Sequence, residues 1–205
     1  MELRLHVRGD RACFKRPEFA EDMVSYDVIT PMAARGLFEA IHAPPGLRWR
    51  IDEIEVLRPI RSTWMSLAAT HGDPMRAVVP GIVGGQRDRR MANVLSDVGY
   101  VITAHVMSAA SGNADEAVQM ATIRRRISDQ SWLHAPYLGL PVFPAQIALI
   151  EAGDPLPDTA LRGSGPFDLG WMLYDREASA PRFFRAIMID GVIDLRRFDS
   201  LILAG

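Results

Sequence analysis

Alternating apolar and polar residues open the chain and predict its first strand. Over residues 2–8, Leu3, Leu5 and Val7 face one way and the polar residues between them face the other. A period of two is typical of a half-buried strand. Residues 98–106 repeat the alternation and predict another strand of the same kind.

Apolar residues at helical spacing predict two helices. The first spans residues 31–42, where Thr30 is a suitable N-cap and the proline after it suits the first helical position. The second spans residues 113–128 and begins with Asn113 and Glu116 at capping-box spacing. A cluster of arginines in its last turn is favourable there, because the carboxyl end of a helix attracts cations.

The remaining segments complete the order of elements. Further strands are predicted at residues 49–57, 138–151, 167–174 and 182–189. Asp190 and Gly191 form a strong hairpin signal directly after the last of them. Residues 61–96 show only weak periodicity and predict a long loop, which is usually functional or mobile.

This order predicts an α+β fold. Over residues 1–151 it runs strand, helix, strand, strand, helix, strand, which is the split βαβ or ferredoxin-like (βαββαβ) arrangement. Residues 152–205 predict a C-terminal β-hairpin or sheet extension. They are too few to hold a separate core.

The composition is that of a soluble globular protein, with 48% hydrophobic and 23% charged residues in 205. No apolar run approaches the ~20 residues that cross a bilayer, and the strand pattern begins at once, so we expect neither a membrane partner nor a signal peptide. Cys13 is the only cysteine, which favours a reducing, cytoplasmic location. The five histidines lack metal-site spacing, and we expect no metal and no cofactor.

Arginine carries nearly all of the positive charge, because Lys15 is the only lysine. A net charge of −2 argues against a nucleic-acid protein. The arginines are clustered, however, and a local field rather than the net charge attracts phosphate. A general preference for arginine explains part of the number but less of the clustering. The candidate arginines for contact with a nucleic acid are Arg35, Arg58, Arg61, Arg87, Arg89, Arg90, Arg124, Arg125 and Arg126.

Guanidinium groups pair with phosphate in two-point geometry, and aromatic rings stack on bases. The candidate stacking residues are Tyr26, in an extended arm before the first helix, Trp49 and Tyr137. The alternative for each aromatic residue is core packing, and residues 87–90 read equally well as a solvated loop. Binding of a nucleotide strand would require the arginines to converge in one electropositive cleft.

Residues 25–41, Ser-Tyr-Asp-Val-Ile-Thr-Pro-Met-Ala-Ala-Arg-Gly-Leu-Phe-Glu-Ala-Ile, resemble the first helix of the CRISPR-associated Cas-five family of the RAMP superfamily, in its subtype I-C form. Four further blocks resemble the family in the same order. They are residues 49–60, 134–139, 169–175 and 183–194. Agreement of separate blocks in order is more specific than any one of them.

The resemblance implies an RNA-recognition-like ferredoxin fold and a place in a type I surveillance complex, Cascade. Members hold the 5′ end of the CRISPR RNA, contact the backbone and large subunits, and meet target DNA only through the complex. In subtype I-C the member also cuts the precursor RNA without a metal. The family uses a tyrosine at the end of the first helix and a Lys-His pair at the start of the second.

This chain departs from that catalytic pattern. His42 stands at the tyrosine position, and Glu116 and Ala117 lie about where the pair would fall. The leading hypothesis is therefore a CRISPR RNA-binding subunit with weak or absent cleavage. The second is an active endoribonuclease with His42 as the base. The third is a ferredoxin-like module for a protein or small ligand, since a fold does not fix a function.

Overall fold

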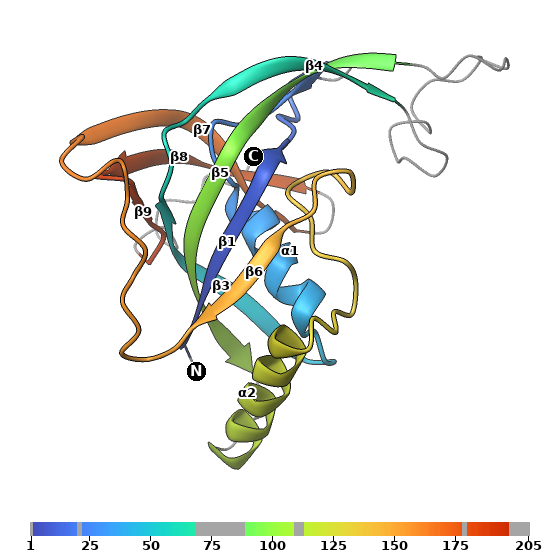
Figure 1. Cartoon of the computed structure of the whole chain (residues 1–205), viewed down its shortest axis with the longest axis vertical. Coiled ribbons are helices and arrows are strands. Elements are labelled where there is room, and N and C mark those ends of the chain that lie inside the picture. Colours follow the sequence, from blue (N-terminus) through green and yellow to red (C-terminus); the bar gives the residue numbers. More distant parts are fainter. Residues whose placement is uncertain (1, 20–21, 69–88, 109–112, 178–179, 197–205) are drawn as a thin grey trace, which may run out of the picture.

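The computed structural model describes residues 2–19, 22–68, 89–108, 113–177 and 180–196, and Figure 1 shows their arrangement. The elements are β1 (Glu2–Ala12), β2 (Met23–Val24), α1 (Pro31–Ile41), β3 (Leu47–Val56), β4 (Ser62–Ala68), β5 (Arg89–Ser108), α2 (Asn113–Ser128), β6 (Gln146–Ile150), β7 (Pro166–Glu177), β8 (Ala180–Ile189) and β9 (Val192–Asp194). The fold is mixed α and β, with a mostly antiparallel sheet and two helices in the described part.

The strands form one sheet in the order β6-β1-β5-β3-β9-β8-β7, and β2 and β4 also pair with β5. β5 is its centre, since it pairs with β1 along one edge and with β3 along the other. Leu5 and Ile54 lie opposite Ile102 on either side, and all three are fully buried. This row belongs to the main core, which α1 helps to cover.

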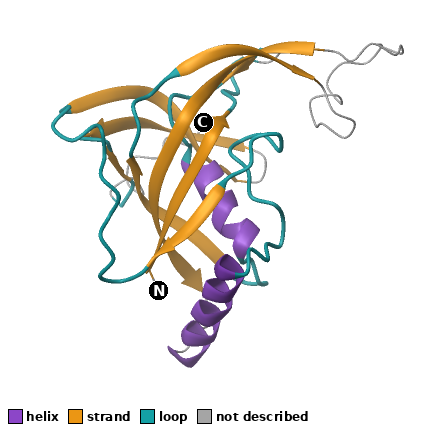
Figure 2. Ribbon diagram, in the orientation of Figure 1, coloured by secondary structure: helices purple, strands orange, loops and turns teal. Residues whose placement is uncertain are grey.

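Local sequence explains α1. The Thr30 hydroxyl accepts a hydrogen bond from the Ala33 N–H at 3.2 Å, as an N-cap should, and Pro31 occupies the first helical position. Leu37, Phe38 and other residues of its apolar face are buried. Figure 2 shows that α1 and α2 meet near their C-terminal ends. Neither of these helices is long and apolar enough to cross a membrane.

Most predicted elements are confirmed. Both helices are present, and so are the strands predicted at the N-terminus, at residues 49–57 and 98–106 and in the C-terminal part. Asp190 and Gly191 connect β8 to β9, with Ile189 opposite Val192 as the hairpin signal predicted. β9 pairs in turn with β3, so the C-terminal strands continue the same sheet.

Two predicted segments differ. Of the predicted strand at 138–151, only Gln146–Ile150 is a strand. The residues before it form a turn, which is closed by the hydrogen bond from the Leu138 N–H to the Phe143 carbonyl. The predicted loop at 61–96 contains β4 and the start of β5, which pair from Ser62 to Ala68. Figure 1 shows this pair as an arm beyond the sheet. Residues 69–88 lie outside the described residues.

A salt bridge fastens α1 to β7. The Arg35 guanidinium donates to both carboxylate oxygens of Asp175, at 2.5 and 2.6 Å. Burial alone would raise the pKa of Asp175, but hydrogen bonds from Arg35 and from the Arg176 N–H outweigh it and lower that pKa. The pair joins residues 140 positions apart. It therefore contributes to tertiary structure rather than to the helix alone.

Gly139 allows two loops to approach closely. Its φ is +83°, and a Cβ added there would lie 1.9 Å from the Cys13 carbonyl oxygen. The neighbouring Leu138 carbonyl accepts the Cys13 N–H at 3.0 Å. Only glycine satisfies both the left-handed backbone and this contact.

We expect Gly139→Ala to lower the free energy of unfolding by about 2–4 kcal/mol, because strain and overlap add. Gly163→Ala is the matched control, since Gly163 has φ +75° but no atom near its added Cβ. The control should cost about 1 kcal/mol, the strain alone. Denaturant unfolding measures both. Equal losses would show that the contact with Cys13 contributes nothing.

We expect Asp175→Asn to cost about 1.5–3 kcal/mol near neutral pH, the contribution of hydrogen bonds to a charged group. The folded-state pKa of Asp175 is lowered, so this contribution is present above the unfolded-state pKa and is lost as pH falls below about 4. The free energies of unfolding of the unaltered chain and of Asp175→Asn, measured by denaturant unfolding, should therefore become equal as the pH falls through that range. Asp158→Asn, which breaks an exposed pair with Arg162, should change stability by about 0.5 kcal/mol or less.

Candidate nucleic-acid interface

His42 ends α1 and is held from several sides. It has an extended backbone, and its N–H donates to the Phe38 carbonyl at 2.9 Å. The Trp49 indole N–H donates to the His42 carbonyl at 2.8 Å, and its ring lies 5.0 Å from that of Phe38. The residue is only 6% exposed. Its backbone and ring position are therefore fixed by the packing of α1 against β3.

Both ring nitrogens of His42 have partners on α2. Nε2 forms a hydrogen bond with the Gln119 side-chain oxygen, and Nδ1 faces the Arg126 guanidinium at 3.3 Å. A guanidinium only donates, so Nδ1 accepts and Nε2 carries the proton that Gln119 receives. In this arrangement the imidazole has no lone pair open to a substrate hydroxyl.

The arginine triplet of α2 points in three directions, as the helical step requires. Arg124 donates to both oxygens of Glu151 at 2.8 Å. Arg125 is exposed and forms no ion pair within the described ranges. Arg126 turns inward and donates to the Ile41 carbonyl at 2.7 Å, which closes the C-terminal end of α1. Only Arg125 of the three is both exposed and unpaired.

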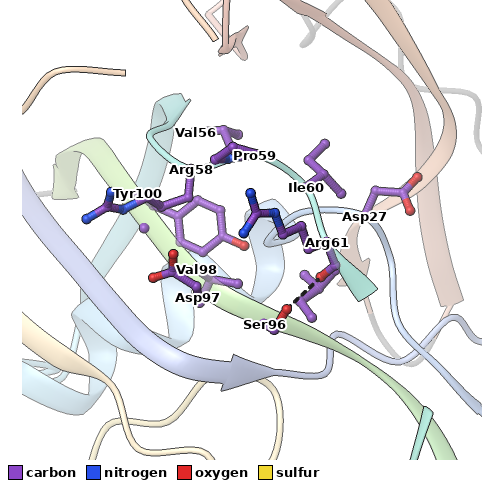
Figure 3. A pocket seen from close by; sticks show the side chains of 12 residues that line it. Asp27, Val56, Arg58, Pro59, Ile60, Arg61, Ser96, Asp97, Val98 and Tyr100 are labelled. Carbon is purple, nitrogen blue, oxygen red and sulfur yellow. Dashed lines mark hydrogen bonds between the residues drawn. The ribbon is translucent and has the colours of Figure 1, made fainter. Parts of the chain in front are cut away.

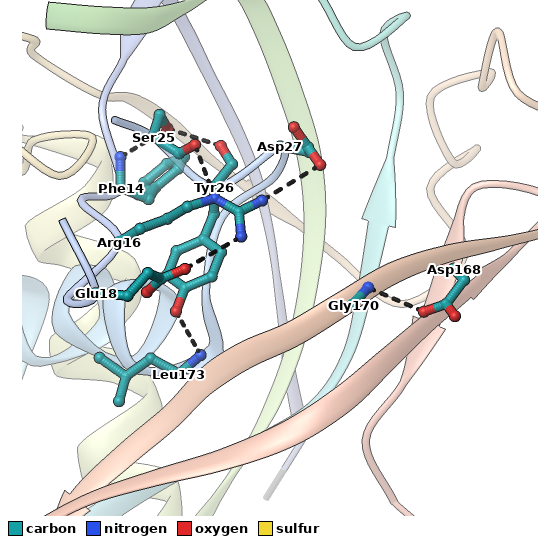
Figure 4. A network of polar contacts seen from close by, with 9 residues as sticks. All are labelled: Phe14, Arg16, Glu18, Ser25, Tyr26, Asp27, Asp168, Gly170 and Leu173. Carbon is teal, nitrogen blue, oxygen red and sulfur yellow. Dashed lines mark hydrogen bonds and ion pairs between the residues drawn. The ribbon is translucent and has the colours of Figure 1, made fainter. Parts of the chain in front are cut away.

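Tyr26 lies in the core instead of offering a stacking surface. Its side chain is fully buried, its hydroxyl accepts the Leu173 N–H at 3.2 Å, and the Arg16 guanidinium covers its ring at 4.5 Å (Figure 4). Burial, with help from Glu18, raises its pKa to about 12. The expectation that Tyr26 stacks on a base is wrong for this arrangement, because neither ring face is open.

Arg58 and Arg61 follow β3 and line a small hollow with Asp97 and Tyr100 (Figure 3). Both arginines are exposed, and neither forms an ion pair with a described residue. The Arg61 carbonyl accepts the Ser96 N–H at 3.0 Å. Their guanidinium groups are thus available, while the backbone at Arg61 is anchored to β5.

The other predicted arginines are scattered. Arg35 is engaged by Asp175, as described above. Arg87 and the side chain of Arg89 lie outside the described residues, and Arg90 pairs with Leu67 in the arm.

Those predicted arginines that the structure describes do not meet in one cleft, so the expectation of a single electropositive cleft is wrong for them. Arg126 contacts His42 at the end of α1, and the His42 carbonyl accepts from Trp49, which lies opposite Val106 on β5. The Arg61 carbonyl accepts from Ser96, which precedes Val106 by ten residues on β5. At a strand's rise, Ser96 and Val106 lie about 30 Å apart. An RNA strand that contacts both arginines would have to run along the sheet.

Two polar groups on the sheet are not among the site residues that the sequence predicts. One is the pair of Asp52 and His105, in which the two carboxylate oxygens of Asp52 lie 2.9 and 2.7 Å from the Nδ1 atom of His105. His6 and Arg8 of β1 lie near Arg58, and burial together with these two arginines lowers the pKa of His6. The alternation of β1 was the available signal, since it predicts that His6 and Arg8 share one face. No cluster of three or more metal-ligating side chains occurs in the described part of the chain.

Comparison with known proteins identifies the family. Residues 2–196 match the family described as CRISPR-associated protein (Cas_Cas5). The chain is 41% identical over 214 residues to the CRISPR pre-crRNA endoribonuclease Cas5d of Mannheimia succiniciproducens, over 96% of this chain and 95% of that protein. It is 36% identical over 173 residues to the protein of the same name from Thermus thermophilus, over 84% of this chain and 72% of that protein.

A solved structure supports the same fold. The crystal structure of a CRISPR-associated protein superposes with a TM-score of 0.73 at 20% identity, over 100% of this chain and 97% of that one. The sequence matches span nearly the whole chain, including all the elements that build the sheet. The chain therefore belongs to the CRISPR-associated Cas5 family, and its form is that of Cas5d.

Proposed function

We propose that this chain is the CRISPR RNA-binding subunit of a type I-C-like Cascade surveillance complex and holds the 5′ handle of the RNA. The observation that carries the proposal is 41% identity over 96% of the chain to a relative named for its action on precursor CRISPR RNA. The partners are the RNA and the backbone and large subunits, and target DNA is reached through the complex. The location is cytoplasmic, which the free buried thiol of Cys13 fits.

The proposal includes a ferredoxin-like core over residues 1–151 with a β extension over 152–205. The order β6-β1-β5-β3, with antiparallel neighbours, supports it, because these four strands are the ones connected through α1 and α2. RNA-binding modules of this architecture present a sheet face or its edges to single strands.

Unpaired guanidinium groups support phosphate contact. Arg58, Arg61 and Arg125 are exposed and unpaired in the part of the chain that the structure describes. Arg35 and Arg124 are each held by a carboxylate, which must be displaced before a phosphate can bind. We therefore assign the main RNA contacts to the three unpaired arginines, Arg58, Arg61 and Arg125.

We expect the purified chain to bind CRISPR repeat RNA more tightly than an unrelated RNA of equal length at physiological salt. The logarithm of the affinity should fall linearly with the logarithm of salt, with a slope of about 0.7 per phosphate neutralised on a single strand. Fluorescence anisotropy measures both. Equal affinity for the two RNAs would contradict recognition of the handle.

Cleavage of the precursor is the second candidate function, because both named relatives are called endoribonucleases. The reaction joins a 2′-oxygen to the adjacent phosphorus and breaks the bond to the 5′-oxygen. It needs a base for the hydroxyl proton, an acid for the leaving oxygen and positive charge on the phosphorane. Arg126 could supply charge. His42 could act as the base only after its ring leaves Arg126, which now occupies the accepting nitrogen.

Labelled repeat RNA incubated with the chain in EDTA tests this function. If His42 is the base, His42→Ala should slow specific cutting by about 10²–10⁴-fold. His134→Ala is the matched control, because His134 is exposed and its N–H bonds to α1 at Ala40, close to His42. Cutting that survives in His42→Ala excludes His42 as the base. Absence of cutting by the unaltered chain removes the second function and leaves RNA binding intact.

A further inference from the structure

One face of the sheet carries a basic group that α1 does not cover. Leu5 and Val7 of β1 point into the core. Because side chains alternate along a strand, His6 and Arg8 point to the opposite face. Arg8 lies between Gly99 of β5 and Gln146 of β6, in register with both. Arg8 and Gln146 are exposed, and His6 is half-buried.

Arg58 reaches the same place from the end of β3. A Cβ added to Gly99 would lie 3.2 Å from the Arg58 Cγ, so the stem of this side chain lies across the glycine. Gly99 is the residue directly opposite Arg8. A side chain at position 99 would hold Arg58 away from β1. The glycine therefore allows the two arginines to approach one another over the outward face.

Arg8 and Arg58 lie close together without an ion-pair partner among the described residues. Neither Arg8 nor Arg58 forms an ion pair with any residue in the described ranges, and both disfavour the protonated form of His6. Two exposed acids lie nearby, Asp10 on the same face of β1 as Arg8 and Asp97 in the hollow that Arg58 lines, but neither forms an ion pair with Arg8 or Arg58. Like charges held together at a surface repel one another. An anion bound between them would remove that repulsion and gain their hydrogen bonds.

We infer that Arg8, Arg58 and Gln146 form a phosphodiester-binding site on the outward face of β1 and β5, and that it takes the backbone of the RNA strand. The inference rests on the proposed RNA binding and adds the place and the residues. Two guanidinium groups match the oxygens of one or two successive phosphates, and the amide of Gln146 can bond the ribose or base beside them. His6 lies beside Arg8 on the same face of β1, where its ring could donate a further hydrogen bond.

The site differs from the His42 region. His42 and Arg126 lie where α1 and α2 meet, whereas Arg8 and Gly99 lie across the sheet from the helices and nearer its other end. The hollow below Arg58 is lined by Arg61 as well, so a strand that leaves the site meets another free arginine. RNA bound here would follow β1.

The double variant Arg8→Gln/Arg58→Gln tests the site by RNA anisotropy. The matched control is Arg162→Gln/Arg185→Gln, which removes the same charge from two exposed arginines that are paired with Asp158 and Asp168. We expect the first to weaken repeat-RNA binding about 10- to 100-fold at physiological salt and to lower the salt slope by about 1.4, the value for two phosphates on a single strand. The control should keep the slope of the unaltered chain.

The outcomes are separable. No repeat-RNA binding by the unaltered chain would overturn the proposed function itself. Binding by the unaltered chain with equal affinities and slopes in the two double variants would overturn only the site. Loss of assembly with partner subunits at unchanged RNA affinity would also overturn it and show that this face binds protein. Thermal unfolding of each variant confirms that the comparison is between folded proteins, since all four positions are exposed.

Discussion

The backbone hydrogen bonds of β5 are the constraint on which the other features depend. Because β5 pairs with β1 on one side and β3 on the other, its register decides which residues of all three strands share a face. A slip by one residue would exchange the two faces completely. The observed register buries Leu5, Ile54 and Ile102 together and turns the basic residues of β1 outward. The core and the proposed RNA face are thus two consequences of one pairing.

Some arginines are hydrogen-bonded within the protein and others are not, and the two groups have different roles. Arg35 is held by Asp175 and Arg124 by Glu151, and each pair connects separate elements. Arg126 does the same through the Ile41 carbonyl. Arg35 and Arg124 hold the helices to the sheet, and Arg126 holds the two helices to each other. Arg8 and Arg58 have no such partner within the described residues, which leaves their donors for a ligand.

The elements with strong local signals were predictable, and the long-range contacts were not. Thr30 and the proline after it determine where α1 begins, and Asp190 with Gly191 determines the last hairpin. The β4 arm was missed because burial does not alternate along it: Trp64 is 57% exposed, whereas Met65 and the two residues after it are all half-buried. Tyr26 was misjudged for the opposite reason. Its neighbours in sequence resemble an exposed arm, and only the folded chain brings the Leu173 N–H to its hydroxyl and Arg16 over its ring.

A near-neutral chain can still bind RNA because charges at a surface act over short distances. Screening at physiological salt limits their reach to about 8 Å. Acids that are paired with arginines elsewhere, such as Asp168 with Arg185, therefore weigh little at Arg8 and Arg58. The net charge of −2 counts paired and unpaired charges equally. A bound phosphate responds mainly to the unpaired guanidinium groups beside it. What matters is where the unpaired guanidinium groups lie, and the alternation of β1 together with the missing side chain of Gly99 places two of them side by side.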